Sequence, residues 1–539
     1  MSPRLAMTTL TALLLLGPVA PAVAAPAPTA LAAAPISTAP LPSVHTASTV
    51  YGLTVNGTAV PVNGYAGYDY AQFSMGAGTA QITVRKLAGG NVGAVAISPV
   101  KHGYQATRSG STATFTIPTA EYLIVSLDNQ RRLVIAADPA ETDRPANSGP
   151  DIFNVMSSRF NADPTGRTVT TAAVQAALNA ASAYGSQPTY SRGIVYVPRG
   201  VYTVGNLELK SNTSLYLEAG AVLRITPTKS LYSMDARKAS QSRDLTWWIQ
   251  TEFGSTNIKL FGRGTLDGNG MAATRAGFGM NILAPIATSN FTLSGLTIRE
   301  SASWAVVPIR SHDVTLTNVK LFNRFDMGEV DGVDVVESQN VTVRRGVGVG
   351  LDDPYTTKSY DRTVDIGTRW PGASEQVRDV TFDGLISWTY CYGFKVGQGV
   401  FSTQENVVFK NGVVVDAAIG IGIHHKAGAG TASGVTFDNI DIERLSATND
   451  NKRTWLAVMI NDSVGDGAGP ISGVTVRNVN VRDRGTTPAL LTGLSAGSAI
   501  NDVRFDSIRM PGSSGYARTL AALNITAPTF VNRITILPE

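Results

Sequence analysis

Three aspartates near the middle of the chain have a spacing that suggests chemistry. Asp331 lies in the segment GEVDGVDV, and Asp352 and Asp353 follow 21 residues later in GVGLDDPYTTKSY. Neighbouring residues of a strand point to opposite faces, so one carboxylate of the adjacent pair should face the interior, where an isolated charge is costly. Carboxylates close together raise at least one pKa, which places a proton donor beside a proton acceptor. Hydrolysis of a glycosidic bond requires that combination.

A repeating strand pattern is what would bring these carboxylates together. Units made of an Asn, Asp or Gly turn and two short alternating strands recur between residues 257 and 512, with start-to-start spacings from 23 to 39 residues. One unit cannot bury its inner face alone, whereas stacked units can, and the period suits a coil of a right-handed parallel β-helix. A sandwich of hairpins is the alternative, but its turns should recur about every 8 to 12 residues without a longer period. In the β-helix, the 21-residue interval places Asp352 and Asp353 on the coil above Asp331.

The rest of the chain divides by composition. Residues 1–24 contain a basic residue, an apolar run and a small-residue cleavage site, which predicts a signal peptide and a secreted, extracellular protein rather than a membrane anchor. The Ala/Pro-rich residues 25–48 predict a flexible tether. Short alternating segments within 49–140 predict a small antiparallel β-sandwich, and 141–160 predict a linker. The β-helix is predicted over 161–539, with the helical segment TVTTAAVQAALNAASAYG capping its first coil.

Composition and charge exclude several classes of function. Apolar residues make up 43% of the 539 residues, charged residues 16%, and there are 53 glycines, which favours a folded, turn-rich β protein. The 44 basic and 40 acidic residues are too evenly balanced to predict binding to nucleic acid or a membrane. The single Cys391 cannot form an internal disulfide or a thiolate zinc site. We therefore expect a monomer without a cofactor or metal, with a calcium site at Asp352 and Asp353 as the alternative.

Several motifs resemble the polygalacturonase-like glycoside hydrolase family, which is related to the dextranase family. They lie within residues 171–223, in FGRGTLDGNG, and in DGVDVVESQNVTVRRGVGVGLDDPYTTKS, and the resemblance spans about residues 150 to 515. It implies a pectin-degrading hydrolase that inverts the anomeric centre. Asp352 would be the general acid, while Asp331 and Asp353 would position and activate water. The residues expected to bind the polysaccharide are Lys358, Tyr392, Lys395, Gln398, His424 and Lys426.

The sequence departs from that family at two positions where the pectin-cleaving members bind substrate. Cys391-Tyr392-Gly393 stands in place of Gly-His-Gly, and His424-His425-Lys426 stands in place of Arg-Ile-Lys, so that only the lysine matches. Histidine cannot reproduce the bidentate grip of arginine on a carboxylate. A neutral α-glucan therefore remains an alternative substrate to galacturonan. A polysaccharide lyase and a non-catalytic carbohydrate-binding β-helix are alternatives of other classes.

Two aspartates, two tryptophans and the adjacent histidines also have alternative interpretations. Asp267 and Asp334 are expected to be turn or ladder residues of the repeat rather than catalytic groups. Trp304 and Trp388 suit either stacking on sugar rings or packing in the core. His424 and His425 are neighbours on a predicted strand, so at most one of them should face the cleft.

Overall fold

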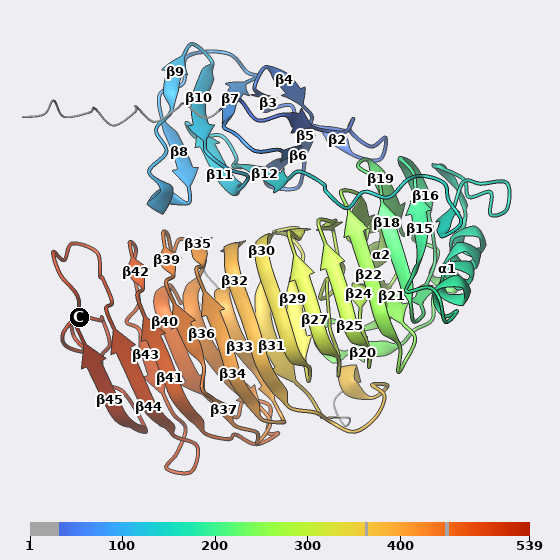
Figure 1. The fold of residues 1–539 in the computed structure, drawn as a ribbon. Helices are drawn as coiled ribbons and strands as arrows, with labels where there is room; N and C mark the ends of the chain where they lie inside the picture. The colour runs from blue at the N-terminus through green and yellow to red at the C-terminus, as the bar shows by residue number, and fades with distance from the viewer. Residues whose placement is uncertain (1–31, 362–364, 448–451, 539) are drawn as a thin grey trace, which may run out of the picture.

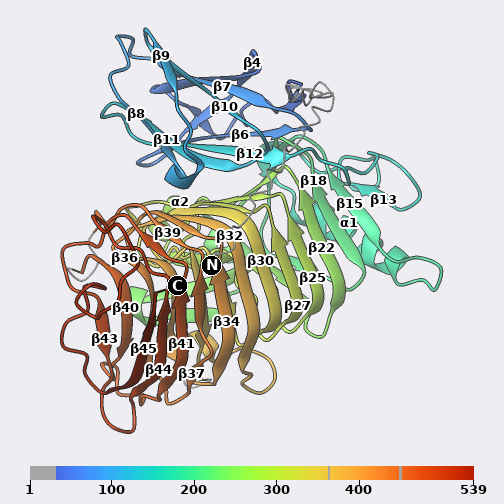
Figure 2. The same cartoon turned by 60° about the vertical axis from the view of Figure 1, so that its left-hand side comes forward.

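The chain folds into a β-sandwich that lies along one side of a long parallel β-helix (Figures 1 and 2). The computed structural model describes residues 32–361, 365–447 and 452–538. The parallel β-helix predicted from the repeat is confirmed by the parallel pairing of strands from successive coils, and connections between parallel strands of one sheet are as a rule right-handed. The predicted signal peptide lies outside the described residues.

The sandwich is built from two facing sheets with an apolar core between them. The first sheet contains β1 (Ile36–Ser37), β2 (Thr46–Ala47), β5 (Val62–Gly64), β6 (Asp69–Met75), β8 (Val95–Ser98), β11 (Tyr122–Leu127) and β12 (Leu133–Pro139). The second contains β3 (Tyr51–Val55), β4 (Thr58–Val60), β7 (Ala80–Lys86), β9 (Thr107–Ser109) and β10 (Thr112–Ile117). Pairing is antiparallel as predicted, except that β6 and β12 run parallel.

The part of the predicted tether that the structure describes is packed rather than flexible. Strand β1 pairs with β6, and β2 pairs with β5, so this Pro-rich segment completes the edge of a sandwich sheet. His45 Nε2 also lies 3.2 Å from Asp267 Oδ2 on the β-helix. The edge hydrogen bonds that these strands satisfy explain why the segment is ordered despite its composition.

One long sheet runs the length of the β-helix, with successive coils hydrogen-bonded in parallel. Its early strands are β13 (Ile152–Asn154), β14 (Thr165–Val169), β15 (Gly193–Val197), β16 (Gly200–Thr203), β18 (Thr213–Leu217), β19 (Ala221–Arg224), β22 (Thr256–Gly262), β23 (Thr265–Asp267), β25 (Ser289–Ser294), β26 (Thr297–Arg299), β27 (His312–Thr317) and β28 (Lys320–Phe322). Its later strands are β30 (Gln339–Gly350), β32 (Val377–Thr389), β34 (Gln404–Lys410), β35 (Val413–Asp416), β37 (Ala432–Ser433), β38 (Thr436–Asp438), β39 (Asp441–Ile442), β41 (Ile471–Arg477), β42 (Asn480–Val481), β44 (Ile500–Asp506) and β45 (Val531–Leu537). We call this the long sheet. Because β13 pairs with β15, the first coil begins inside the predicted linker 141–160.

Two shorter sheets form the other wall. The first contains β17 (Leu207–Leu209), β20 (Ala236–Lys238), β21 (Arg243–Thr251) and β24 (Phe278–Ala284). The second, which we call the cleft sheet, contains β29 (Val333–Val336), β31 (Tyr355–Ser359), β33 (Tyr392–Val400), β36 (Ile419–Ala427), β40 (Thr454–Ile460) and β43 (Leu490–Thr492) in that spatial order. Each coil therefore adds one strand to the cleft sheet.

Helix α1 (Thr171–Gly185) covers the open end of the first coil, as the sequence predicts. It buries Val174, Ala177, Leu178 and Ala181, whose spacing of three and four residues lines one helical face. The short helix α2 (Gly270–Arg275) lies in a later coil. Within the described ranges, no helix is long and apolar enough to cross a membrane.

Aromatic side chains join the sandwich to the β-helix. Tyr68 of the sandwich lies 5.6 Å from Trp388 between ring centroids, and its hydroxyl donates a hydrogen bond to the carbonyl oxygen of Asn323 at 2.9 Å. Trp388 thus packs in a core shared by both domains, which decides between its two interpretations. The sandwich therefore packs against strands β28, β30, β32 and β35 of the long sheet.

Candidate active site

The candidate catalytic aspartates come together at the start of the cleft sheet. Asp331 precedes β29, and Asp352 and Asp353 precede β31. These two strands pair in parallel with Val333 opposite Tyr355, which aligns Asp331 with Asp353 on adjacent coils. The backbone N–H of Gly332 donates to the carbonyl oxygen of Asp353 at 3.0 Å. All three carboxylates line one pocket of about 420 Å³.

Two of the three carboxylates are neutralised by buried lysines. Lys358 Nζ lies 2.6 Å from Asp331 Oδ2, and Lys395 Nζ lies 2.6 Å from Asp353 Oδ2. All four side chains are at most 5% exposed, so these are buried ion pairs. Both lysines line the pocket as expected of substrate-binding residues, but their ammonium groups hold aspartates.

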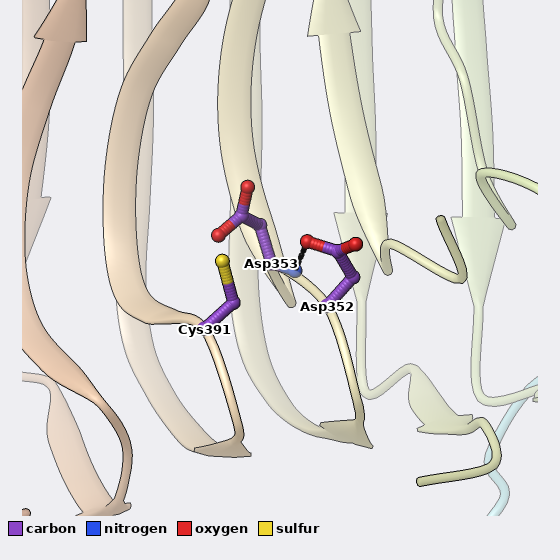
Figure 3. A group of neighbouring side chains, drawn as sticks. All are labelled: Asp352, Asp353 and Cys391. Atoms are coloured by element: carbon purple, nitrogen blue, oxygen red, sulfur yellow. Dashed lines mark hydrogen bonds between the residues drawn. The ribbon is translucent and has the colours of Figure 1, made fainter. Parts of the chain in front are cut away.

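Asp352 is held differently. Its Oδ1 accepts a hydrogen bond from the backbone N–H of Asp353, and its Oδ2 accepts one from the backbone N–H of Glu329, both at 3.1 Å. Figure 3 shows the first of these bonds, with the two carboxyl groups side by side at the turn. Among the described residues, no lysine or arginine forms an ion pair with it. Burial and the neighbouring Asp353 raise the pKa of Asp352.

Asp334 belongs to this cluster, although the sequence predicts a turn or ladder residue. Its Oδ1 lies 2.5 Å from Lys358 Nζ, so one lysine serves both Asp331 and Asp334. Burial raises the pKa of Asp334 well above its usual range, and Asp331 adds to that effect against the opposing charge of Lys358. Burial also raises the pKa of Asp331, again opposed by Lys358. Because one ammonium cannot neutralise two carboxylates, we assign the proton to Asp334 and the charge to Asp331.

The other predicted binding residues divide into two groups. Gln398 and Lys426 line the pocket and are partly exposed. Tyr392 and His424 are buried outside the pocket lining and stack on each other, with ring centroids 6.2 Å apart. Burial lowers the pKa of His424 to about 3, so the ring is neutral, and its Nε2 contacts the amide of Asn461 at 3.1 Å.

The pocket has further walls that sequence reasoning missed. Arg237, Lys238 and Ser240 come from a segment between β19 and β21 in which β20 pairs antiparallel to β21, against the parallel rule of the repeat. Lys238 Nζ lies 4.1 Å from the ring centroid of Trp304, and Lys358 Nζ lies 3.9 Å from it. Trp304 therefore lines the pocket between two cations, although only 2% of it is exposed. The segment between β19 and β21 does not follow the strand repeat, so the repeat pattern in the sequence could not place it. Its position beside the pocket follows from the antiparallel pairing of β20 with β21.

The geometry gives little support to a metal site. Donor atoms of Asp352, Asp353 and Cys391 lie within 4.8 Å of one another. Figure 3 shows these three side chains grouped together. Calcium binds six to eight oxygen ligands, whereas this group offers two carboxylates and a thiol. Lys395 already supplies the positive charge beside Asp353, and burial raises the pKa of the Cys391 thiol, which keeps it protonated. The residues present do not fit the calcium alternative.

Residues 189–369 match the model of glycosyl hydrolases family 28. The predicted resemblance to this family is confirmed. A probable polygalacturonase of Vitis vinifera is 25% identical over 275 residues, covering 48% of this chain and 55% of that protein. Exopolygalacturonase B of Aspergillus niger is 23% identical over 329 residues, covering 56% and 71%. This chain thus spans about half the length of the first of these relatives.

Two solved structures share the fold. An exopolygalacturonase from Thermotoga maritima superposes with a TM-score of 0.51 at 16% identity, covering 73% of this chain and 93% of that one. Dex49A from Penicillium minioluteum superposes with a TM-score of 0.52 at 13% identity, covering 92% and 96%. The share of this chain that Dex49A covers is larger than the β-helix alone, so the similarity extends into the sandwich.

Proposed function

We propose that this protein hydrolyses α-glycosidic bonds of a polysaccharide, with Asp352 as general acid and Asp331 and Asp353 as the groups that activate water. The observation that carries this proposal is the division among the pocket carboxylates. Of the three candidate catalytic aspartates, two are paired with buried lysines, whereas the third, within the described residues, is held by backbone N–H groups and forms no ion pair. Neighbouring carboxyls in unequal surroundings, one beside an ammonium group and one without, are suited to act as base and acid of a hydrolytic site.

In the proposed mechanism, Asp352 donates its proton to the glycosidic oxygen as the bond to the anomeric carbon breaks. Asp331 and Asp353 remain ionised beside their lysines and take a proton from the attacking water. Inverting glycosidases generally hold the acid and base carboxyls about 6.5 to 9.5 Å apart, which leaves room for that water. Oxygens of Asp352 and Asp353 lie within 4.8 Å of each other, so for this pair the expected spacing is not met and the stereochemistry of the product decides the assignment. Catalysis with retention would need one carboxylate to attack the anomeric carbon directly.

The substrate we favour is galacturonan. The family match and the names of the polygalacturonase relatives support it, as does Lys426, a partly exposed pocket lysine that forms no ion pair within the described residues. A free ammonium in the pocket suits the carboxylate of a uronic acid. We further propose that the protein is secreted, acts outside the cell and is monomeric.

A neutral α-glucan is the second candidate. The two-domain similarity to Dex49A favours it, and so does histidine at position 424, where an arginine would grip a uronate. The lyase alternative is less supported, because Lys358 and Lys395 are engaged with aspartates and are not available as bases. A purely binding protein would have no use for three carboxylates in one partly buried pocket.

A reducing-sugar assay on polygalacturonan and dextran tests the proposal, followed by proton NMR of the first-formed product. We expect new reducing ends on galacturonan and an inverted anomer, with Asp352→Asn inactive as the control. Release from dextran alone would transfer the assignment to the neutral glucan. Unsaturated, ultraviolet-absorbing ends would indicate a lyase, and a retained anomer would contradict the roles given to the aspartates.

A further inference from the structure

A turn beside the general acid is held by the segment that forms the opposite wall of the pocket. Lys238 Nζ lies 2.8 Å from Glu329 Oε2, and Ser240 Oγ donates to Glu329 Oε1 at 2.9 Å. One residue further, the amide of Gln241 donates to the carbonyl oxygen of Gly328 at 3.0 Å. We call Lys238, Ser240 and Gln241 the clamp. The clamp holds both the side chain of Glu329 and the backbone just before it.

The turn that the clamp holds has an unusual backbone. Glu329 has a φ of +60°, in the left-handed region that side chains other than Gly, Asn and Asp seldom adopt. In this conformation its N–H donates to Asp352 Oδ2 at 3.1 Å. The clamp therefore stabilises the conformation that directs this N–H at the carboxyl of the acid.

The side chain of Glu329 acts on the same carboxyl through its charge. Burial alone would raise the pKa of Glu329, but Lys238 outweighs burial and brings the pKa to about 2, so the group is ionised. The charged groups that face Asp352 are Asp353, Glu329 and Asp331, which favour its protonated form, and Lys395 and Lys358, which oppose it. Glu329 is the one of these carboxylates that is paired with a lysine from outside the cleft sheet.

We propose that Glu329, held by the clamp, is a positioning residue for the general acid. Its backbone N–H orients the carboxyl of Asp352, and its carboxylate, balanced by Lys238, sets the pH at which that carboxyl loses its proton. The inference rests on the proposed function only in naming Asp352 as the acid. The segment between β19 and β21 would then both line the pocket and, through the clamp, position the general acid.

The pH dependence of kcat/KM tests this inference, because its alkaline limb reports the loss of the acid's proton. Glu329→Gln removes a negative charge and leaves Lys238 unbalanced, so the limb moves to lower pH, by about half to one unit. Lys238→Met leaves the charge of Glu329 unbalanced, so the limb moves to higher pH by a similar amount. The double variant removes a neutral pair, and its limb returns close to that of the wild type.

Asp326→Asn is the matched control. Asp326 is an exposed carboxylate in the same loop, pairs with Arg324 at 2.7 Å and does not line the pocket. Its loss removes the same charge three residues away and should leave the limb in place. A limb that stays fixed in Glu329→Gln while kcat falls at every pH would assign Glu329 a structural role only, and would overturn the proposal.

A direct titration separates this inference from the proposed function. The protein is labelled with ¹³C at aspartate carboxyls, and Asp352→Asn identifies the Asp352 resonance by its disappearance. Opposite displacements of that titration in Glu329→Gln and Lys238→Met support the inference even if no glycan is cleaved. Unchanged or like-signed displacements overturn it even if the wild-type enzyme hydrolyses galacturonan.

Discussion

The long sheet and the cleft sheet are built from the same coils, yet their buried charged side chains have different partners. In the long sheet, Val341, Val380 and Val407 stand in register on successive coils, and the rings of Phe382, Phe409 and Phe437 stack with centroids 4.6 and 5.3 Å apart. The long sheet also buries charged side chains, and two of them pair with the sandwich: Lys320 with Asp138, and Asp416 with Arg132. In the cleft sheet and the turns that lead into it, the buried charged side chains pair with one another at the pocket. These are Asp331, Asp334, Asp353, Lys358 and Lys395.

This contrast shows where stability and function are placed in a repeat protein. Apolar ladders stabilise each coil against the next, and every coil can carry them. A buried ion pair adds little or no stability compared with apolar residues of similar size, because both charges lose their hydration. The charges of the cleft sheet are therefore better explained by the chemistry of the pocket than by the fold.

The largest expected effect of a single change is on the acid itself. Asp352→Asn keeps the shape of the side chain and its place at the turn but removes the transferable proton. We expect kcat to fall by roughly 10³-fold or more with little change in substrate binding, because the proton matters chiefly in the transition state. Steady-state kinetics on galacturonan together with calorimetric binding of oligogalacturonides measure both quantities. A variant that retained a tenth of its turnover would remove Asp352 from the role of acid.

The next largest effect is expected where one half of a buried pair is removed. Lys395→Met leaves Asp353 buried without its partner, and such a change destabilises proteins by about 3–5 kcal/mol. Lys410→Met in the long sheet is the control, because Lys410 and Asp383 are 41% and 34% exposed and 3.5 Å apart. An exposed pair of that kind contributes about 1 kcal/mol or less. Urea denaturation of the two variants compares them, and equal losses would contradict the contrast between the sheets.

The fold could be predicted from the sequence because its determinants are local and repeated. Each coil has alternating apolar residues and an Asn, Asp or Gly turn, and Asp331 and Asp352 are one such interval apart. The capping helix is equally local, since α1 shows its apolar spacing in the chain itself. Structural features that recur along the chain, or that lie within one helix or strand, can therefore be predicted from the sequence.

The rest of the site depends on contacts between residues far apart in the chain. Lys238 reaches Glu329 from an insertion without any period, and His45 reaches Asp267 from a Pro-rich segment that reads as a tether. Asp334 had a signal that was available: it alternates with Val333 and Val335 on a strand whose valines face the core. That alternation places Asp334 on the face opposite the core, which is the face of Lys358.

Asp334→Asn is expected to have a smaller effect on stability, and one of opposite sign, because this variant should be more stable than the wild type at neutral pH. The folded-state pKa of Asp334 is raised, so the folded protein holds a proton that the unfolded chain releases above its own pKa of about 3.9. Wild-type stability therefore falls relative to the variant as the pH rises from that value toward the folded-state pKa. Asparagine does not titrate, so the variant should match the wild type near pH 3 and be more stable at neutral pH. Melting temperatures across this range test the sign, and a variant less stable at pH 7 would show that Asp334 is ionised beside Lys358.

The smallest effect on stability is expected at a left-handed residue within strand β34 of the long sheet. Asn406 has a φ of +53°, its side chain is exposed, and its amide donates to Asp379 Oδ1 of the preceding coil at 2.6 Å. Asn406→Ala introduces a side chain that disfavours the left-handed region, at a cost of about 1–2 kcal/mol. Asn406→Gly loses the same hydrogen bond but adopts this φ freely, so we expect a change of about 0.5 kcal/mol or less. Denaturation midpoints of the two variants separate the backbone from the side chain: equal losses would mean that the asparagine ladder, rather than the left-handed conformation, holds adjacent coils together.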